Sequence, residues 1–259
     1  MAITLRSRRE IDLMAKAGAV VADVLWKLQE LAKPGVSTGF LDGIAEEMTR
    51  KAGATALFKG VRSPYAKKAF PGVVCASVNE QVVHGIPDEK VILKNGDILS
   101  IDFGVRLDGF CGDSAITVGI GDVSATNKRL IDATRRVLNI AVENCRAGIK
   151  WSEVAGLMQS FAESAGFSVV KEFVGHGIGR QMHEDPKVPN FVSKELLADD
   201  ILLKEGMVLA IEPMINAGTD DTRTLKDGWT VVTKDRKNSA HFEHTVAIMK
   251  DGCEVLTAK

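Results

Sequence analysis

The sequence predicts an α+β fold made of two halves with the same order of elements. Apolar residues repeat at helical spacing in four segments, two at the start of the chain and two near its middle. Strand-like stretches follow each helical pair, so the order helix–helix–strands occurs twice, over residues roughly 1–120 and 121–259. No linker rich in glycine, serine or proline separates the halves. We therefore expect residues 1–259 to form a single domain with a site between its halves.

Four helices are expected, at residues 8–33, 37–53, 126–147 and 152–165. The first should end before Pro34, which cannot continue a helix. The second should begin at Ser37, whose hydroxyl is a favoured N-cap. The third and fourth should end at Gly148 and Gly166, because glycine is preferred just after a helix.

Strands are expected at residues 73–83, 98–117, 168–174, 208–215, 230–233 and 245–250. The second segment contains Asp108-Gly109, a strong signal for a two-residue hairpin turn. Such a turn places Asp113 opposite Gly104. The same register places Asp102 opposite Ala115. Because side chains alternate along a strand, the two aspartates should share a face as diagonal neighbours, about 7–8 Å apart at their backbones.

The composition restricts the classes of function. Apolar residues make up 45% of the chain and charged residues 26%, both near the average for soluble globular proteins. A net charge of −1 gives no reason to expect nucleic acid or an anionic membrane as the main partner. The four cysteines are widely spaced without a CxxC pair, which argues against disulfides or a thiolate zinc site. With no apolar signal-peptide core and no run of about 18 apolar residues, we expect a cytoplasmic protein.

Five residues in order have side chains typical of metal ligands: Asp102, Asp113, His176, Glu212 and Glu243. Four carboxylates and one imidazole suit two adjacent divalent cations better than one structural zinc. Buried carboxylates on one strand face repel each other, and a cation between them removes that cost. The alternatives are a solvent-exposed strand face for the two aspartates and arginine salt bridges for the two glutamates.

Histidines near strand ends form a second group of candidates. His176 stands between Gly175 and Gly177, His183 follows seven residues later, and His84 ends an apolar strand before a turn. The glycine-rich stretch is not a dinucleotide loop, because Arg180 stands where the last glycine of that motif is required. The sequence also lacks a G-x-S-x-G elbow, a P-loop and an HExxH motif.

Five segments in order resemble methionine aminopeptidases of the short bacterial and organellar type. They are NEQVVHGIP, GDILSIDFGVRLDGFCGDSAITV, VGHGIGRQMHEDP, LAIEPM and WTVVTKDRKNSAHFEHT. The resemblance covers nearly the whole chain. It implies the pita-bread fold, with two pseudo-symmetric halves around a central antiparallel sheet and a centre of two metals. It also implies removal of the initiator methionine from nascent proteins whose second residue is small.

The resemblance implies how the ligands divide between the two metals. Asp102 would bind one metal. His176 and Glu212 would bind the other, and Asp113 and Glu243 would bridge both. A hydroxide between the metals would attack the scissile carbonyl. The ions could be Fe(II), Mn, Co or Zn, since a site dominated by carboxylates accepts all of them.

The resemblance also implies catalytic and substrate-binding residues. His183 matches the family histidine at the scissile carbonyl oxygen, and His84 matches the one near the substrate amide. Glu212 is a candidate proton shuttle. The methionine pocket is expected to use Phe70, Cys75, Met182 and Trp229, for which plain core packing is the alternative. Met182 departs from the family pattern, because many relatives have Phe there, and the loop at residues 57–68 is longer and more basic than expected.

The expected partners are the N-termini of nascent polypeptides and the ribosome, with no nucleic-acid specificity, no membrane and a monomeric state. Two other functions remain open. One is an aminopeptidase P or prolidase relative, which shares the five ligands and the fold but usually carries an extra N-terminal domain. The other is a non-catalytic binding protein on the same fold.

Overall fold

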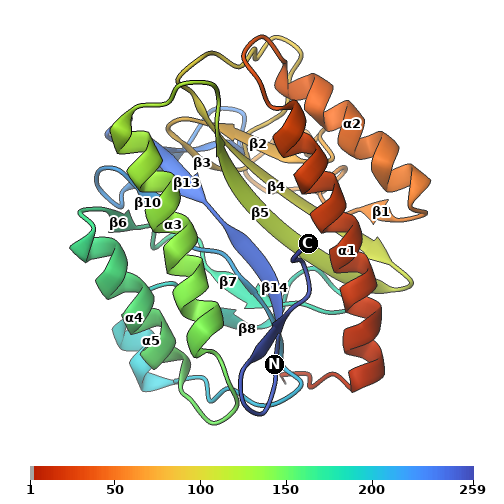
Figure 1. Ribbon diagram of the computed structural model, residues 1–259, viewed down its shortest axis with the longest axis vertical. Coiled ribbons are helices and arrows are strands. Elements are labelled where there is room, and N and C mark those ends of the chain that lie inside the picture. Colours follow the sequence, from red (N-terminus) through yellow and green to blue (C-terminus); the bar gives the residue numbers. More distant parts are fainter. Residues whose placement is uncertain (1–2) are drawn as a thin grey trace.

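The computed structural model describes residues 3–259, and in it helices cover one face of a central antiparallel sheet (Figure 1). The helices are α1 (Arg8–Leu31), α2 (Thr38–Lys51), α3 (Ala125–Asn144), α4 (Trp151–Ser164) and α5 (Lys194–Ala198). Nine strands of the described chain form the central sheet, in the order β1-β4-β5-β14-β9-β7-β8, with β2 paired to β4 and β15 to β14. Two three-stranded sheets, β13-β10-β6 and β11-β12-β3, complete the structure.

The strands are mostly short. In chain order they are β1 (Thr55–Ala56), β2 (Cys75–Val78), β3 (Gln81–Val83), β4 (Ile98–Leu107), β5 (Phe110–Gly119), β6 (Ser168–Val169), β7 (Gly175–Gly177), β8 (Glu184–Val188), β9 (Val208–Ile211), β10 (Met214–Asn216), β11 (Thr222–Thr224), β12 (Val231–Thr233), β13 (Ser239–His241), β14 (Glu243–Ile248) and β15 (Cys253–Val255). The long hairpin of β4 and β5 belongs to the first half of the chain, and β9 and β14 belong to the second.

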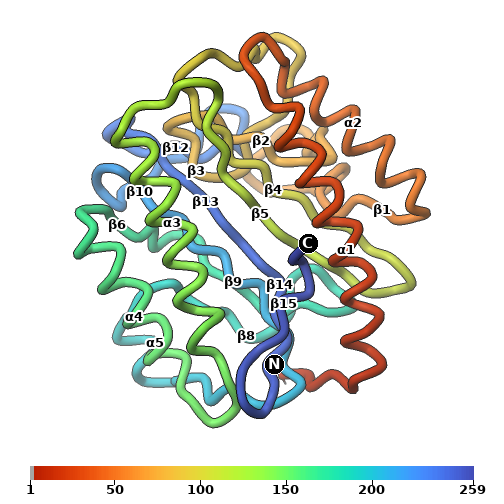
Figure 2. Tube along the Cα trace, in the orientation of Figure 1, coloured from red at the N-terminus to blue at the C-terminus, as the bar shows by residue number. Residues whose placement is uncertain are grey.

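Each half covers its own part of the sheet with one helix pair. In the view of Figure 1, α1 and α2 lie on one side of the molecule and α3 and α4 on the other. The apolar core is divided in the same way: Leu28 and Phe103 belong to the first half, while Trp151 and Leu209 belong to the second. In the view of Figure 2, β14 runs between the two helix pairs. It pairs with β5 and so joins the two halves. In the part of the chain described, no helix combines the length and hydrophobicity needed to cross a membrane.

The predicted hairpin register is confirmed. Asp102 pairs with Ala115 and Gly104 pairs with Asp113. The turn residues Asp108 and Gly109 have φ values of 50° and 82°, and positive φ at both positions is what a type I′ turn requires. Local turn chemistry therefore sets the relative position of the two aspartates.

Two glycines let α1 lie directly on this hairpin. A Cβ atom on Gly112 would stand 2.8 Å from the backbone nitrogen of Gly18, which is closer than real Cβ contacts. A Cβ on Gly18 would stand 2.0 Å from the carbonyl oxygen of Leu256, so the end of the chain lies on the same part of the helix. The close approach places the helix backbone beside the residue that precedes Asp113.

Several predicted strands were too long. The stretch at residues 73–83 forms two strands, β2 and β3, because the chain turns at Asn79, where φ is 57°. The stretch at residues 208–215 is interrupted at Glu212-Pro213, since proline has no N–H for the ladder. The stretch at residues 168–174 forms a ladder only at Ser168–Val169.

The four predicted helices are present, and their ends lie within two residues of the predicted bounds except at one end. The hydroxyl of Ser37 accepts from the N–H of Phe40 at 3.0 Å, as an N-cap does, and Gly166 has a φ of 84° just after α4. The third helix, however, ends at Asn144 rather than at Gly148. There the chain leaves the helix so that Ala147 can donate to the carbonyl of Met249 at 3.0 Å. The short elements β1, β7, β8, β11, β13, β15 and α5 were not predicted from the sequence.

Candidate metal centre

The five predicted ligands come from five separate segments of the central sheet. Asp102 lies on β4, Asp113 on β5 and His176 on β7, while Glu212 follows β9 directly and Glu243 begins β14. All five line one cavity of about 820 Å³. The ladder explains part of this arrangement, because Ala115 on β5 pairs with Asp102 on one side and with Glu243 on the other.

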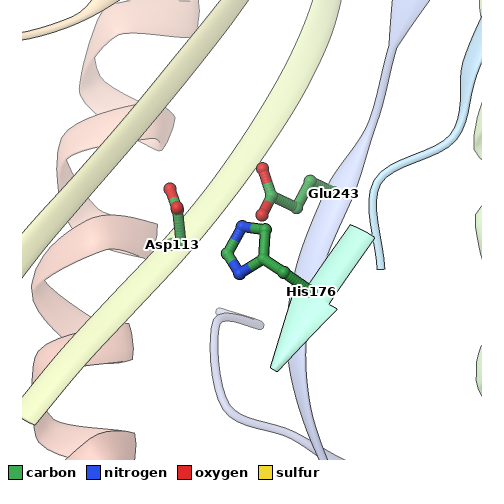
Figure 3. A group of neighbouring side chains, drawn as sticks. All are labelled: Asp113, His176 and Glu243. Carbon is green, nitrogen blue, oxygen red and sulfur yellow. The ribbon is translucent and has the colours of Figure 1, made fainter. Parts of the chain in front are cut away.

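Three of the five have ligand atoms close to one another. Asp113, His176 and Glu243 each place one ligand atom within 4.8 Å of the other two. Figure 3 shows these three side chains, which come from different strands of the sheet. Glu212 is adjacent, with its Oε1 3.5 Å from Nε2 of His176. Gly104 leaves room for this group, since a Cβ there would stand 2.9 Å from Oδ1 of Asp113.

Burial makes these carboxylates costly without a counter-charge. Among the residues that the structure describes, Oδ1 of Asp102, Oδ1 of Asp113 and Oε1 of Glu243 are buried without a hydrogen-bond partner. Burial raises the pKa of Asp113 to about 7. Burial, and then the charges of neighbouring carboxylates, also hold the pKa values of Asp102, Glu212 and Glu243 well above their ordinary range. Clustered oxygen donors without partners fit a site for divalent cations.

The imidazole of His176 is oriented for metal binding. Its Nδ1 lies 2.9 Å from the carbonyl oxygen of Gly177, so this nitrogen donates and the lone pair is on Nε2. Burial, and then the neighbouring His183, lower the pKa of His176 to about 4. The ring is therefore neutral near pH 7, as a metal ligand must be.

The other two predicted histidines line the same cavity. The ring of His183 lies 4.3 Å from that of His176, measured between centroids. His84 follows β3 with a φ of 58°, and its ring meets those of Phe173 and Trp229 edge-on at 5.7 and 6.5 Å. The three imidazoles thus lie along one wall, between the acidic group and the aromatic residues.

An apolar cluster lines the same cavity next to these imidazoles. Phe70 and Cys75 are buried together, and Met182 and Trp229 pack against them. The rings of Phe70 and Trp229 meet edge-on at 5.3 Å, and the indole N–H donates to the carbonyl of Lys68 at 3.0 Å. Phe58 also belongs to this cluster, but the sequence did not single it out because it lies in a loop without periodicity.

The turn that carries Met182 and His183 is held by the N-terminal segment. The guanidinium of Arg6, whose side chain is 6% exposed, forms an ion pair with Glu184 and occupies the space beside Gly179. The other oxygen of Glu184 accepts from the backbone N–H of Gln181 at 3.0 Å. The backbone N–H of Arg6 itself donates to the carbonyl of Gly206 at 2.7 Å.

One residue beside the site received no prediction. His241 is buried, and its Nε2 lies 3.9 Å from Oε2 of Glu212. The only signal in the sequence was an imidazole in an otherwise apolar or small-residue stretch two positions before Glu243.

Comparison with known proteins gives a consistent result. The family model described as Metallopeptidase family M24 matches residues 12–250. A methionine aminopeptidase of Aquifex aeolicus is 45% identical over 257 residues, which is 99% of each chain. One of Clostridium perfringens is 48% identical over 255 residues, which is 98% of each chain.

Solved structures agree with these relatives. The structure of methionine aminopeptidase from Thermotoga maritima aligns with a TM-score of 0.93 at 37% identity and covers 100% of both chains. Prolidase from Pyrococcus furiosus aligns with a TM-score of 0.76 at 19% identity, with 65% of that chain covered, which shows the shared fold alone. The predicted pita-bread fold is confirmed. On the match over residues 12–250 and these full-length likenesses, the chain belongs to metallopeptidase family M24.

Proposed function

We propose that this protein is a metal-dependent aminopeptidase that removes an N-terminal methionine when the next residue is small. The observation that carries the proposal is the composition of the cavity. Its acidic and imidazole groups adjoin an apolar wall formed by Phe70, Cys75, Met182 and Trp229. Full-length similarity to proteins named methionine aminopeptidase supports the same substrate.

The residues present fit two divalent ions. Asp102 would hold one ion, His176 and Glu212 the other, and Asp113 and Glu243 would be shared between them. When bound, such ions supply a Lewis acid and a water of lowered pKa. The ions could be Fe(II), Mn, Co or Zn, because oxygen-rich sites accept each of them.

The remaining polar residues would handle the proton and the substrate amide. Glu212 would take up the proton released on attack and pass it to the leaving amine. His183 would donate to the carbonyl oxygen of the scissile bond, where negative charge develops. Its neutral ring suits this role, because burial lowers its pKa. His84 would hold the amide of the same bond.

The apolar wall suits a methionine side chain. An unbranched thioether fills an irregular apolar pocket well and makes favourable contacts with aromatic rings. Phe70 and Trp229 supply those rings, and Met182 supplies a second flexible thioether. Cys75 is buried at the same wall, where burial holds its thiol pKa well above the ordinary value and keeps it protonated.

One assay separates this function from the alternatives. The protein is stripped of metal with chelator, restored with each candidate ion, and offered Met-Ala-Ser and Xaa-Pro peptides. We expect release of methionine only after metal is restored. Cleavage of Xaa-Pro peptides alone would instead indicate a prolidase-like enzyme. Absence of metal-dependent cleavage of both substrates would indicate a binding protein.

The proposal extends to the setting of the reaction. The substrates would be N-termini of nascent polypeptides in the cytoplasm, met at the ribosome by a monomeric enzyme. Co-sedimentation with ribosomes and light scattering of the purified protein test these two points. A protein that stays in the supernatant would contradict the first, and a dimeric mass would contradict the second.

A further inference from the structure

His241 lies beside the candidate metal centre without a role in the proposed function. It ends β13 and is 1% exposed. Its Nε2 has no hydrogen-bond partner among residues 3–259. A buried polar nitrogen without a partner destabilises a fold. This nitrogen lies 3.9 Å from Oε2 of Glu212, at ion-pair distance.

The backbone of His241 is fixed from two sides. The hydroxyl of Thr117 accepts from the N–H of His241 at 2.8 Å and donates to its carbonyl at 2.8 Å. The hydroxyl of Ser100 lies 2.8 Å from that of Thr117. On the other side, His241 pairs with Met214 in the ladder of β10 and β13. The imidazole therefore starts from a rigid position.

The carboxylate of Glu212 lies between two imidazoles. Its Oε1 is 3.5 Å from Nε2 of His176, and its Oε2 faces Nε2 of His241. Its backbone carbonyl accepts from Nδ2 of Asn190 at 3.1 Å, which fixes the main chain as well. When Glu212 is ionised, as a metal ligand must be, a lone pair on Nε2 of His241 would face a negative oxygen and be repelled. The tautomer with a proton on Nε2 is therefore favoured, and it offers a donor to Oε2.

We propose that His241 is a positioning residue, which donates from Nε2 to Oε2 of Glu212 and so keeps Oε1 directed toward His176 and the metals. The inference rests on the proposed function, in which Glu212 is a ligand and carries a proton. The separation of 3.9 Å is longer than a hydrogen bond, and a small rotation of the carboxylate closes it. Removal of a group that orients a metal ligand in this way typically lowers metal affinity 10- to 100-fold.

Two variants separate the donor from the bulk of the ring. His241→Gln keeps an N–H donor, whereas His241→Leu fills the space without one. Mn²⁺ binding to the metal-stripped proteins is measured by calorimetry, and kcat and KM are measured with Met-Ala-Ser. For His241→Leu we expect Mn²⁺ binding weakened about 10-fold and kcat lowered, with KM little changed. His241→Gln should stay within about threefold of the unmodified protein in both measurements.

His244 provides a matched control, because it is a half-buried histidine three residues further on. Its Nδ1 is held by Thr257 at 2.9 Å, and its side chain points to the other face of β14 from Glu243. His244→Asn should leave Mn²⁺ affinity unchanged. If it weakens binding as much as His241→Leu does, the effect comes from disturbing the strand, and the proposal is overturned.

Two other results would also overturn the proposal. One is an Mn²⁺ affinity of His241→Leu equal to that of the unmodified protein. The other is a loss of Mn²⁺ affinity in His241→Gln as large as that in His241→Leu. If the leucine variant does not fold, nitrogen-15 NMR of the unmodified Mg²⁺- or Zn²⁺-loaded protein reports the tautomer of His241 directly. A proton on Nδ1 instead of Nε2 would contradict the proposal.

The proposed function and the role of His241 can fail separately. If the unmodified protein binds Mn²⁺ but releases no methionine, the proposed function fails, while the calorimetry still tests the role of His241.

Discussion

At the scale of single residues, the burial of four carboxylates determines the electrostatics of the cavity. Asp102, Asp113, Glu212 and Glu243 all have raised pKa values, first because of burial. The pKa of His176 is lowered for the same reason. Both shifts favour neutral side chains in the metal-free protein. Metal binding reverses the preference of the carboxylates, because it requires them to be ionised.

Replacing Asp113 by Asn tests this reasoning. We expect kcat/KM to fall at least about 100-fold and metal binding to weaken, because a neutral amide replaces a ligand between the two ions. The metal-free variant should unfold at a temperature no lower than that of the unmodified protein, since the amide cannot ionise in a position where burial destabilises the ionised carboxylate. Asp108→Asn, an exposed change in the same hairpin turn, is the control and should keep both properties. Undiminished activity of Asp113→Asn would exclude the assigned role.

His84 gives the fold a dependence on pH. Burial lowers its pKa to about 4, below the ordinary 6.5. Between these values the unfolded chain binds a proton that the folded protein excludes, so acidification favours unfolding. The contribution of His84 to the free energy of unfolding is fully present above pH 6.5. It is lost as the pH falls toward 4, and the loss is at most about 3 kcal/mol. Urea unfolding at pH 7 and pH 4.5 should show a smaller loss in His84→Asn; equal losses would contradict the assignment.

At the scale of elements, two contacts between segments far apart in the chain hold the site-bearing segments in place. Arg6 ties the N-terminal segment to the turn that carries Met182 and His183, through Glu184. The contact of Gly18 with Gly112 sets α1 directly on the hairpin that carries Asp113. Glu184 also lines the cavity and Gly112 directly precedes Asp113, so both contacts should matter for the geometry of the cavity.

Removing the Arg6 side chain should affect both stability and substrate binding. Arg6→Ala removes the partner of Glu184, whose side chain is 19% exposed, and frees the turn with His183; losing one partner of such a charged pair typically costs about 1–3 kcal/mol. We expect kcat/KM for Met-Ala-Ser to fall about 10-fold. Arg8→Ala is a matched control, because its ion pairs with Asp12 and Glu254 are exposed to solvent and should contribute little to stability. The same change in activity for both variants would show that the turn does not depend on Arg6.

The close contact between helix and hairpin predicts a large effect from one methyl group. Gly112→Ala places a carbon against the backbone of α1 and should lower the free energy of unfolding by about 2 kcal/mol. Gly43→Ala, within α2, has open space around the added carbon and should raise stability by up to about 1 kcal/mol. Urea unfolding of the two variants measures both effects, and a neutral result at Gly112 would mean that the helix can move away freely.

The sequence predicted those elements whose cause is local. The positions of Asp102 and Asp113 followed from a turn type and strand alternation alone. The strands β7, β8 and β13 were missed, because segments of three to five residues containing glycine, proline or buried polar groups carry no readable period. The contact of His241 with Glu212 depends on pairing between distant segments, which no local pattern encodes.

At the scale of the whole molecule, the candidate metal centre joins the two halves. Asp102 and Asp113 come from the first half, and His176, Glu212 and Glu243 come from the second. The backbone also joins the halves, because β5 of the first half pairs with β14 of the second. A bound metal would therefore connect the halves as well as serve the reaction, which supports treating residues 1–259 as one catalytic domain.

Metal should stabilise both halves together. With Mn²⁺ at 100 times its dissociation constant, linkage adds about 2.7 kcal/mol to the free energy of unfolding. Calorimetry should show a single transition without metal and a single transition at higher temperature with it. Two separate transitions, only one of which responds to Mn²⁺, would contradict a single domain.

The pairing of β4 with β5 also limits where relatives of this chain can carry insertions. One residue inserted in β5 between Phe110 and Asp113, without a compensating bulge, would shift the pairing by one position and move Asp113 to the opposite face of the sheet. Insertions at the exposed loop around Tyr65 carry no such penalty, because no ligand depends on that register. A distant homologue with a single-residue gap in this part of β5 is therefore expected to have lost the metal centre, even where all five ligand residues remain.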